Sequence, residues 1–430
     1  KAGRNSIERG QRDHWTRYPS RLEEFGADAL KKPELRDARM YVIPRDQPDF
    51  PTAAKFVEKL MQCGIEVEQL EEGTTLPGVQ GQSIPAGSFV IRGDQAFRPH
   101  ILDMFEPQDH PNDFQYPGGP PIRPYDNAGY TLAHQMGVKF YRVLDAVDVK
   151  TRAAVIPLAW EWGRTQMSKS VNFAFRDANV ALKEGKPVAS GRYFDRSGNA
   201  SAGMARLTRR PRVALWDRYG GSMESGWTRL VLEQFEFDFE VVYPPDLDRG
   251  DLNSKYDCII FPDGAIPGPS TGAGRGQGGG AQSSIQDDMS IPFIYRRRAG
   301  SVGERTLQEL RKFVDNGGHL LCIGSSALNI ARQFKLPVES ALVDEKGAAL
   351  PNTKFYIPGS VLRVKVNEGP LSYGYEDHVD VLFDNSPVFK VAPNSGVDIV
   401  ALFDTDKPLR SGWAWGQEAL KDNAAIVDAP

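Results

Sequence analysis

The sequence predicts an α/β fold built of consecutive three-layer modules, and the strongest evidence lies in residues 212–331. Short apolar segments alternate there with amphipathic segments of helical period. The apolar segments are nearly continuous in Val, Ile, Leu and Phe, as strands covered on both faces should be. Helices between successive strands imply right-handed crossovers and a parallel sheet. The predicted strands are residues 213–216, 240–243, 258–261 and 320–323.

Two regions precede this domain in chain order. Residues 1–38 are polar and compatible with helix, so we expect a helical lead-in from an upstream domain that is missing from this chain. Residues 39–148 form the first predicted module, in which a proline that opens a helix and a glycine that ends it define a βαβ unit. Its predicted elements are a strand at 40–43, a helix at 51–60, strands at 65–70 and 88–91, and helices at 98–105 and 127–136.

A proline-rich strap, residues 106–126, interrupts the first module. It contains eight prolines or glycines. Proline fixes φ and lacks an N–H, so this stretch cannot form a helix or a central strand. We expect an ordered but irregular surface strap or a polyproline-like connector.

The rest of the chain divides into two further segments. Residues 149–210 predict a short α/β segment, and residues 211–430 predict the last domain. Glycine, serine and glutamine dominate residues 267–282, which indicates a flexible loop. After residue 341 the pattern changes to strands joined by Pro, Gly and Asn turns, which predicts a β-rich C-terminal extension. Its expected strands are residues 354–357, 361–366, 379–383 and 399–403.

Composition excludes several functional classes. The 430 residues are 40% hydrophobic, enough for two or three domains. Fifty-two basic and 56 acidic residues give a net charge of −4, so neither nucleic acid nor an anionic membrane surface is an expected partner. No apolar run reaches the roughly 20 residues of a transmembrane helix. The chain begins with Lys1, and we expect it to be part of a longer polypeptide.

The three cysteines, Cys63, Cys258 and Cys322, are widely spaced and have apolar neighbours in sequence. We interpret them as small buried hydrophobic residues. One disulfide is an alternative in an oxidising compartment, and the sequence does not pair them.

The histidines do not follow the usual zinc spacings. The pairs His-x-x-Glu and His-Glu-x-x-His are both absent. His100, Asp103 and His110 cluster around the proline-rich strap and are weak candidates for a divalent metal site. Turns in which such side chains cap backbone groups are the favoured interpretation.

Four polar residues follow predicted strands of the last domain: Asp217, Asp263, Ser325 and Ser326. Because parallel strands end at one edge of a sheet, we expect these side chains to converge on a crevice there. They are the candidate site residues.

A serine nucleophile at this crevice would need a base and a strained elbow of the Gly-x-Ser-x-Gly type. The sequence after Gly324 lacks the second glycine. His319 begins the same predicted strand and lies roughly 20 Å from Ser325 at strand rise. A degenerate serine hydrolase that uses His378 stays open as an alternative.

Four longer phrases carry a resemblance to a known family. The chain resembles the C-terminal region of bacterial secreted zinc carboxypeptidases of the M14 family, in which α/β modules follow the catalytic domain. The last module is similar to class I glutamine amidotransferase-like domains, which have a flavodoxin-like fold. The phrases are YVIPRDQ at 41–47, FRPHILDMFEPQDHP at 97–111, YPGGPPI at 116–122 and WDRYGGSM at 216–223.

This resemblance implies that zinc and the catalytic residues belong to an upstream carboxypeptidase domain, because no position here matches them. It also implies an extracellular or periplasmic location. The turn that holds the cysteine nucleophile in active amidotransferases aligns with Gly324, and Cys322 lies two residues too early. Residues 150–210 are shorter than the middle module of the family.

The leading interpretation is therefore a non-catalytic accessory region that packs on the upstream peptidase domain and needs no cofactor of its own. A peptide- or carbohydrate-binding module is the second hypothesis. The degenerate hydrolase is the third.

Overall fold

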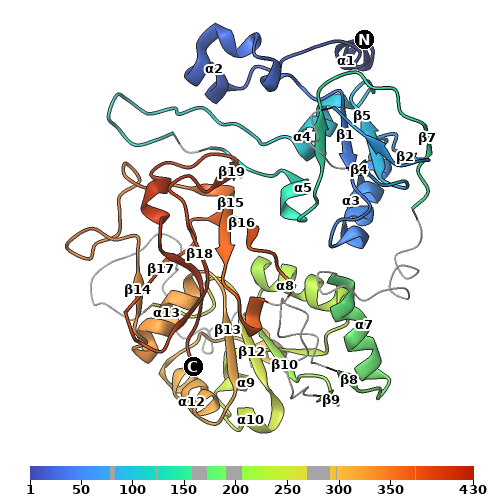
Figure 1. The fold of residues 1–430 in the computed structure, drawn as a ribbon. Helices are drawn as coiled ribbons and strands as arrows, with labels where there is room; N and C mark the ends of the chain where they lie inside the picture. Colours follow the sequence, from blue (N-terminus) through green and yellow to red (C-terminus); the bar gives the residue numbers. More distant parts are fainter. Residues whose placement is uncertain are drawn as a thin grey trace. The chain divides into compact units, whose positions relative to one another are not determined.

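The computed structural model describes residues 1–77, 83–122, 124–156, 172–189, 206–268, 291–296, 298–372 and 374–430 (Figure 1). Its helices and sheets confirm the α/β fold class. The chain divides into two compact units. Unit 1 comprises residues 1–174, 342–385 and 401–422, and unit 2 comprises residues 175–341, 386–400 and 423–430.

This division differs from the expected domain of residues 211–430. Residues 342–385 and 401–422 belong to unit 1 instead. The reason is a long-range pairing, because the N–H groups of Ala128 and Gly129 both donate to the carbonyl oxygen of Gly359, at 2.8 and 3.0 Å. No local pattern in the sequence reveals a pairing between such distant segments.

The first sheet of unit 1 has the order β6-β1-β5-β2-β7, and neighbouring strands are antiparallel. Strands β1 and β2 are parallel to each other with β5 between them, so the expected βαβ unit is split. Helix α3 (Phe50–Gln62) connects the two, and Asp49 caps it by accepting a hydrogen bond from the N–H of Thr52. The strands are β1 (Met40–Ile43), β2 (Glu68–Leu70), β5 (Phe89–Arg92), β6 (Tyr141–Val143) and β7 (Thr151–Ala153).

The two faces of this sheet are covered differently. Tyr41 and Ile91 point to the face that packs on α3 and α4 (Arg98–Phe105). Residues of the opposite face, such as Val42, pack on Leu76 and Ile84 around the short hairpin of β3 (Thr74–Thr75) and β4 (Ser83–Ile84). In the part of unit 1 that is described, helices therefore cover one face, and two layers replace the expected three.

The lead-in of residues 1–38 belongs to unit 1. Helix α1 (Ala2–Gly10) contacts α4, and the side chain of Arg39 donates to the carbonyl oxygen of Gly10 at 2.7 Å. Gly10 has no room for a side chain, because a Cβ there would lie 2.3 Å from the carbonyl oxygen of Gly93. Helix α2 (Pro19–Phe25) and two 3-10 turns follow, Gly26–Leu30 and Pro33–Leu35.

The proline-rich strap forms no helix or strand among its described residues. It runs between α4 and the short helix α5 (Leu132–Gln135). The backbone N–H of Gln108 donates to Ser411 Oγ at 2.9 Å, and the indole N–H of Trp413 donates to Asn112 Oδ1 at 2.7 Å. Trp413 is 4% exposed, so it packs on the strap and offers no free face to a missing domain.

The β-rich segment contributes a second group of strands to unit 1. β15 (Pro358–Val366) and β16 (His378–Asp384) are antiparallel, and β19 (Leu409–Ser411) pairs with β15. The last two residues of β18 (Asp398–Leu402), Ala401 and Leu402, belong to unit 1 and pair with the end of β15. The expected strand at 354–357 is absent, since only Tyr356 forms a bridge there, to Trp415.

Unit 2 contains the predicted parallel sheet, in the order β11-β10-β12-β13. Numbered along the chain, this is strand order 2-1-3-4, as in flavodoxin-like sheets. The strands are β10 (Val213–Trp216), β11 (Phe239–Val242), β12 (Cys258–Phe261) and β13 (His319–Cys322).

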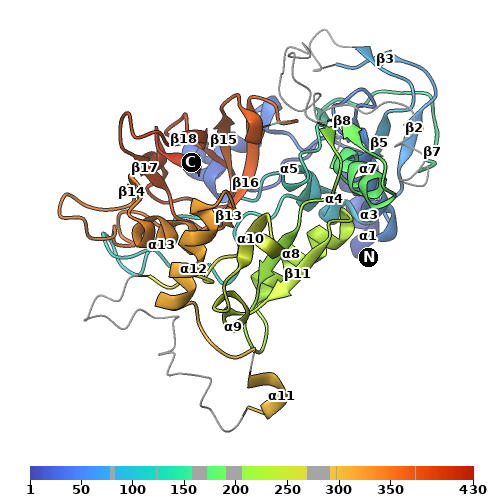
Figure 2. The same ribbon diagram turned by 90° about the horizontal axis from the view of Figure 1, so that it is seen from below.

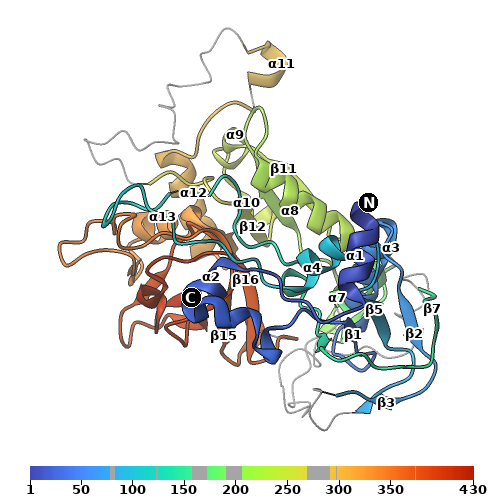
Figure 3. The same ribbon diagram turned by 90° about the horizontal axis from the view of Figure 1, so that it is seen from above.

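Helices cover both faces of this sheet, as predicted. Leu215 packs on Leu232 of α8 (Met223–Gln234), which lies against one face (Figure 2 and Figure 3). Phe261 belongs to the cluster on the other face, with Phe313 of α12 (Glu304–Asp315). Short helices α9 (Pro244–Leu247) and α10 (Leu252–Lys255) join that second face.

The remaining elements of unit 2 come before, between or after the strands of this sheet in the sequence. The strands β14, β17 and β20 pack on α13, with Phe389, Val338 and Ala331 in their common cluster. Most of the predicted flexible loop, residues 269–282, lies outside the described residues. The elements are α7 (Asn172–Lys183), which begins in unit 1, β8 (Val188–Ala189), β9 (Arg206–Leu207), α11 (Phe293–Arg296), α13 (Ser325–Phe334), β14 (Val338–Ser340), β17 (Phe389–Val391) and β20 (Ala424–Asp428).

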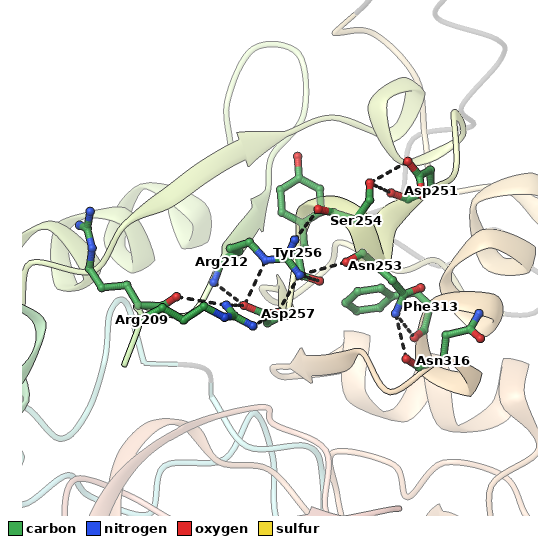
Figure 4. A network of polar contacts seen from close by, with 10 residues as sticks. Arg209, Arg212, Asp251, Asn253, Ser254, Tyr256, Asp257, Phe313 and Asn316 are labelled. Atoms are coloured by element: carbon green, nitrogen blue, oxygen red, sulfur yellow. Dashed lines mark hydrogen bonds and ion pairs between the residues drawn. The ribbon is translucent and has the colours of Figure 1, made fainter. Parts of the chain in front are cut away.

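A network of charged residues fixes the amino edge of the parallel sheet (Figure 4). The carboxylate of Asp257, just before β12, accepts two hydrogen bonds from the guanidinium of Arg209 at 2.6 and 3.0 Å. It also accepts from the backbone N–H and the side chain of Arg212, just before β10. These contacts align two neighbouring strands and lie opposite the edge at which a site is expected.

The cysteines are all free thiols. Cys258 and Cys322 are partly buried, as interpreted from the sequence. Cys63 is exposed, so the prediction of a buried residue is wrong there. It follows the last turn of α3, where the chain leaves the helix.

Candidate functional site

The predicted site residues lie at the carboxyl edge of the parallel sheet in unit 2. Asp217 directly follows β10, and Asp263 follows β12 by two residues. Ser325 and Ser326 are the first residues of α13, which begins after β13. Of the other three candidates, Asp263 forms hydrogen bonds with Ser325 alone, within the described residues.

Ser325 is fully engaged by its neighbours. Its backbone N–H and its hydroxyl both donate to Oδ1 of Asp263 at 2.6 Å. The hydroxyl oxygen accepts from the backbone N–H of Gly264 at 3.1 Å. The hydroxyl proton therefore points to a carboxylate, while a helix N–H group is capped by the same oxygen.

Ser326 is buried and has a structural role. Its hydroxyl donates to the carbonyl oxygen of Pro262 at 2.6 Å. The same oxygen accepts from the backbone N–H groups of Ala265 and Ile266 at 2.9 and 3.1 Å. The side chain thus fastens the turn after β12 to the start of α13, and it is 0% exposed.

The turn between β13 and α13 has the backbone shape of a nucleophile elbow. Gly324 has φ +60° and ψ −137°, a conformation that residues with a side chain rarely adopt. A Cβ placed on Gly324 would lie 2.4 Å from Oδ1 of Asp263. The position that carries the nucleophile in an active elbow therefore has no side chain, and a carboxylate fills the space.

The nearest thiol does not replace it. Cys322 ends β13 and belongs to the cluster under α12. Burial raises the pKa of Cys322 to about 12, so the thiol stays protonated near neutral pH.

In the described part of the chain, the hydrogen bonds of the Ser325 side chain go to Asp263 and Gly264 and to no histidine. His319, the one histidine in the sequence of unit 2, begins β13 and pairs with Cys258 at the amino edge. His378 belongs to unit 1, where its Nε2 contacts Asp404 Oδ2 at 2.9 Å. The alternative of a serine hydrolase therefore gains no support from either imidazole.

Three aromatic residues and one cation accompany this edge. The rings of Tyr219 and Tyr295 lie 6.2 Å apart and are both exposed. The guanidinium of Arg298 lies 5.5 Å from the ring of Tyr243 and 5.7 Å from that of Tyr295. Sequence reasoning missed Tyr295 and Arg298, because they follow a glycine-rich insertion and no strand end points to them.

The weak metal candidates do not form a ligand set. His100 and Asp103 lie one turn apart on α4, and burial raises the pKa of Asp103. His110 Nδ1 is instead 3.2 Å from the carbonyl oxygen of Pro111 in the strap. Among the residues that the structure describes, no three His, Cys, Asp or Glu side chains are grouped to hold a metal ion.

Comparisons with known proteins give little similarity. No protein-family model and no curated protein matches the sequence. A solved structure of a ThuA-like protein from Bacteroides uniformis shares 10% identity over 49% of this chain and 78% of that chain, with a TM-score of 0.25. A TM-score this low supports no conclusion. Within the described ranges, no helix has both the length and the apolar character needed to cross a membrane.

Proposed function

We propose that this chain is a non-catalytic accessory region of a secreted zinc carboxypeptidase. The observation that carries the proposal is the turn at Gly324, where Asp263 occupies the space of a nucleophile. An acyl-transfer enzyme with this fold needs a reactive side chain at that turn, a base beside it and backbone donors around it. Among the described residues, Gly324 has the backbone shape of such a turn and no side chain at the position of the nucleophile.

The partner in this proposal is a carboxypeptidase domain upstream in the same polypeptide, located outside the cytoplasm. Its support is the resemblance of residues 41–47, 97–111, 116–122 and 216–223 to the C-terminal regions of such enzymes. Zinc would be held by that upstream domain and not by His100, Asp103 and His110, which do not fit a zinc site. The region would stabilise the peptidase domain, and peptides would be its substrates.

A peptidase assay tests this proposal directly. The purified chain is incubated with a peptide and added zinc, and release of C-terminal residues is followed by mass spectrometry. We expect no release by the chain alone. In the longer polypeptide, deletion of these residues should lower the melting temperature of the peptidase domain. Release by the isolated chain, or an unchanged melting temperature, would overturn the proposal.

A second candidate function is carbohydrate or peptide binding at the carboxyl edge of unit 2. It is favoured by the exposed Tyr219–Tyr295 pair beside Arg298. Aromatic faces accompanied by a few polar groups are typical of ligand sites. Calorimetry with oligosaccharides and with peptides should give saturable binding that is lost in Tyr219→Ala, if this function is correct.

A further inference from the structure

A pocket in unit 1 is lined by none of the residues discussed so far as site candidates. Its volume is about 370 Å³, within the range of small-molecule sites. The lining residues come from the end of α4, from α5, from β6 and from β19. All of these segments belong to the same compact unit.

One part of the lining is aromatic. Phe105 and Phe140 meet edge to face with ring centroids 5.0 Å apart, and Tyr41 stacks on Phe105 at 4.4 Å. These rings form a rigid apolar wall that would cover the hydrocarbon part of a ligand.

The other part of the lining is basic, with Arg142 and Arg410, and the carboxylates that contact these arginines are already engaged. Glu106 Oε1 accepts from Arg142 Nε at 2.7 Å and from the hydroxyl of Tyr41 at 2.6 Å. Asp380 accepts two hydrogen bonds from Arg363, at 2.8 and 3.1 Å. Both carboxylates are buried, with side chains 5% and 8% exposed.

Arg410 supplies the positive charge in excess. Its Nε lies 3.5 Å from Asp380, but this buried atom forms no hydrogen bond among the described residues. Three arginines thus face two carboxylates, and arginine does not lose its proton in proteins. Desolvation by burial, together with Arg410, lowers the pKa of His134, whose Nδ1 lies 3.8 Å from Asp380 Oδ2.

From this arrangement we propose that the pocket binds a small organic carboxylate with an apolar body. Arg410 and Arg142 would hold the carboxylate, the imidazole of His134 would offer one further hydrogen bond, and the aromatic wall would cover the rest. Arginine pairs with carboxylates through two parallel hydrogen bonds, which gives this ligand class its specificity. A single excess charge and an apolar wall suit a monoanion better than inorganic phosphate.

Isothermal titration calorimetry on the complete 430-residue chain tests the proposal. The probes are 3-phenylpropionate, its neutral analogue 3-phenylpropionamide, and inorganic phosphate. We expect saturable binding of 3-phenylpropionate that weakens with added salt, and at least tenfold weaker binding of the other two. Arg410→Gln should weaken 3-phenylpropionate binding by tenfold or more.

Two variants keep the result interpretable. Arg410→Lys retains the positive charge without the planar fork, and it should bind 3-phenylpropionate better than Arg410→Gln does. Arg229→Gln removes a half-exposed arginine on α8 in unit 2, and it should bind as the wild type does. Equal binding of the amide and the carboxylate, tighter binding of phosphate, or unchanged affinity in a folded Arg410→Gln protein would each overturn the proposal.

Discussion

The carboxylate of Asp263 occupies the space in which a side chain on Gly324 would lie. A Cβ on Gly324 would come within 2.4 Å of Oδ1, and that oxygen also accepts the backbone N–H and the hydroxyl of Ser325. The turn therefore keeps the strained backbone of an elbow while an acid from the neighbouring strand end caps the helix. The contacts between Asp263 and Ser325 at this turn are those of residues that stabilise the start of a helix.

Gly324→Ala should be strongly destabilising. The substitution places a side chain at φ +60°, and it pushes the new Cβ against Asp263. Strain at such a backbone position costs on the order of 1–3 kcal/mol, and the steric overlap adds to it. The free energy of unfolding in urea measures the loss.

Gly264→Ala is the matched control for this substitution. Gly264 has φ +73°, but nothing lies within 4 Å of a Cβ there. Gly264→Ala introduces backbone strain without steric overlap, so Gly324→Ala should lower the free energy of unfolding by more than Gly264→Ala does. Adding Asp263→Ala to Gly324→Ala should recover part of the difference. Equal losses for the two glycines would contradict the steric role of Asp263.

The two adjacent serines should respond differently to alanine. Ser326→Ala removes a buried hydroxyl and leaves the N–H groups of Ala265 and Ile266 without their acceptor. Leaving a buried donor unsatisfied costs about 1–3 kcal/mol, so this variant should lose stability clearly.

Ser325→Ala should cost less, because Ser325 is partly exposed and its backbone N–H still reaches Asp263. Urea unfolding of both variants gives the ranking. A larger loss for Ser325→Ala would show that the Asp263 contact matters more than the buried anchor.

The parallel sheet of unit 2 could be predicted because its signal is local. Strands buried on both faces appear as uninterrupted apolar runs, and the run at Val213–Trp216 is such a strand, β10. The same logic placed Asp263 and Ser325 at one edge. That Asp263 fills the space above Gly324 depends on the exact shape of two turns, which no period in the sequence encodes.

Long-range pairing explains most of the differences from expectation. Residues 342–385 and 401–422 belong to unit 1, where Gly359 pairs with residues 128 and 129 and Trp413 is buried against the strap. The basic pocket has the same origin, since Arg142 and Arg410 are far apart in sequence. Two single arginines that are far apart in the sequence form no local pattern, so the sequence does not predict that they line one pocket.

The three thiols should differ in their reactivity towards iodoacetamide at pH 8. Cys63 is exposed, whereas burial raises the pKa of Cys258 and raises that of Cys322 to about 12. Because the thiolate is the reactive form, Cys63 should be labelled first and the other two should stay protected in the folded protein. Peptide mass spectrometry follows the labelling. All three should react in denaturant, and early labelling of Cys322 would contradict its burial.

The stability of the protein should fall in acid partly through Asp257. Hydrogen bonds from Arg209 and then Arg212 lower the pKa of Asp257 below its ordinary value. The contribution of this carboxylate is therefore present above the unfolded pKa near ~3.9, and it is lost as the pH falls through the folded value.

Asp257→Asn should therefore lower the free energy of unfolding by about 1 kcal/mol at pH 7, because solvent screening limits the strength of a partly exposed network. The cost should shrink as the pH falls below about 4, because the carboxylate of the wild type then loses its charge. Urea unfolding across this pH range measures the cost. Asp28→Asn is the control, since both Asp28 and its partner Lys31 have side chains about three-quarters exposed, at 76% and 77%. That variant should change little at any pH. A cost for Asp257→Asn that is the same at low and neutral pH would show that packing, and not the charge on the carboxylate, holds the amino edge of the sheet.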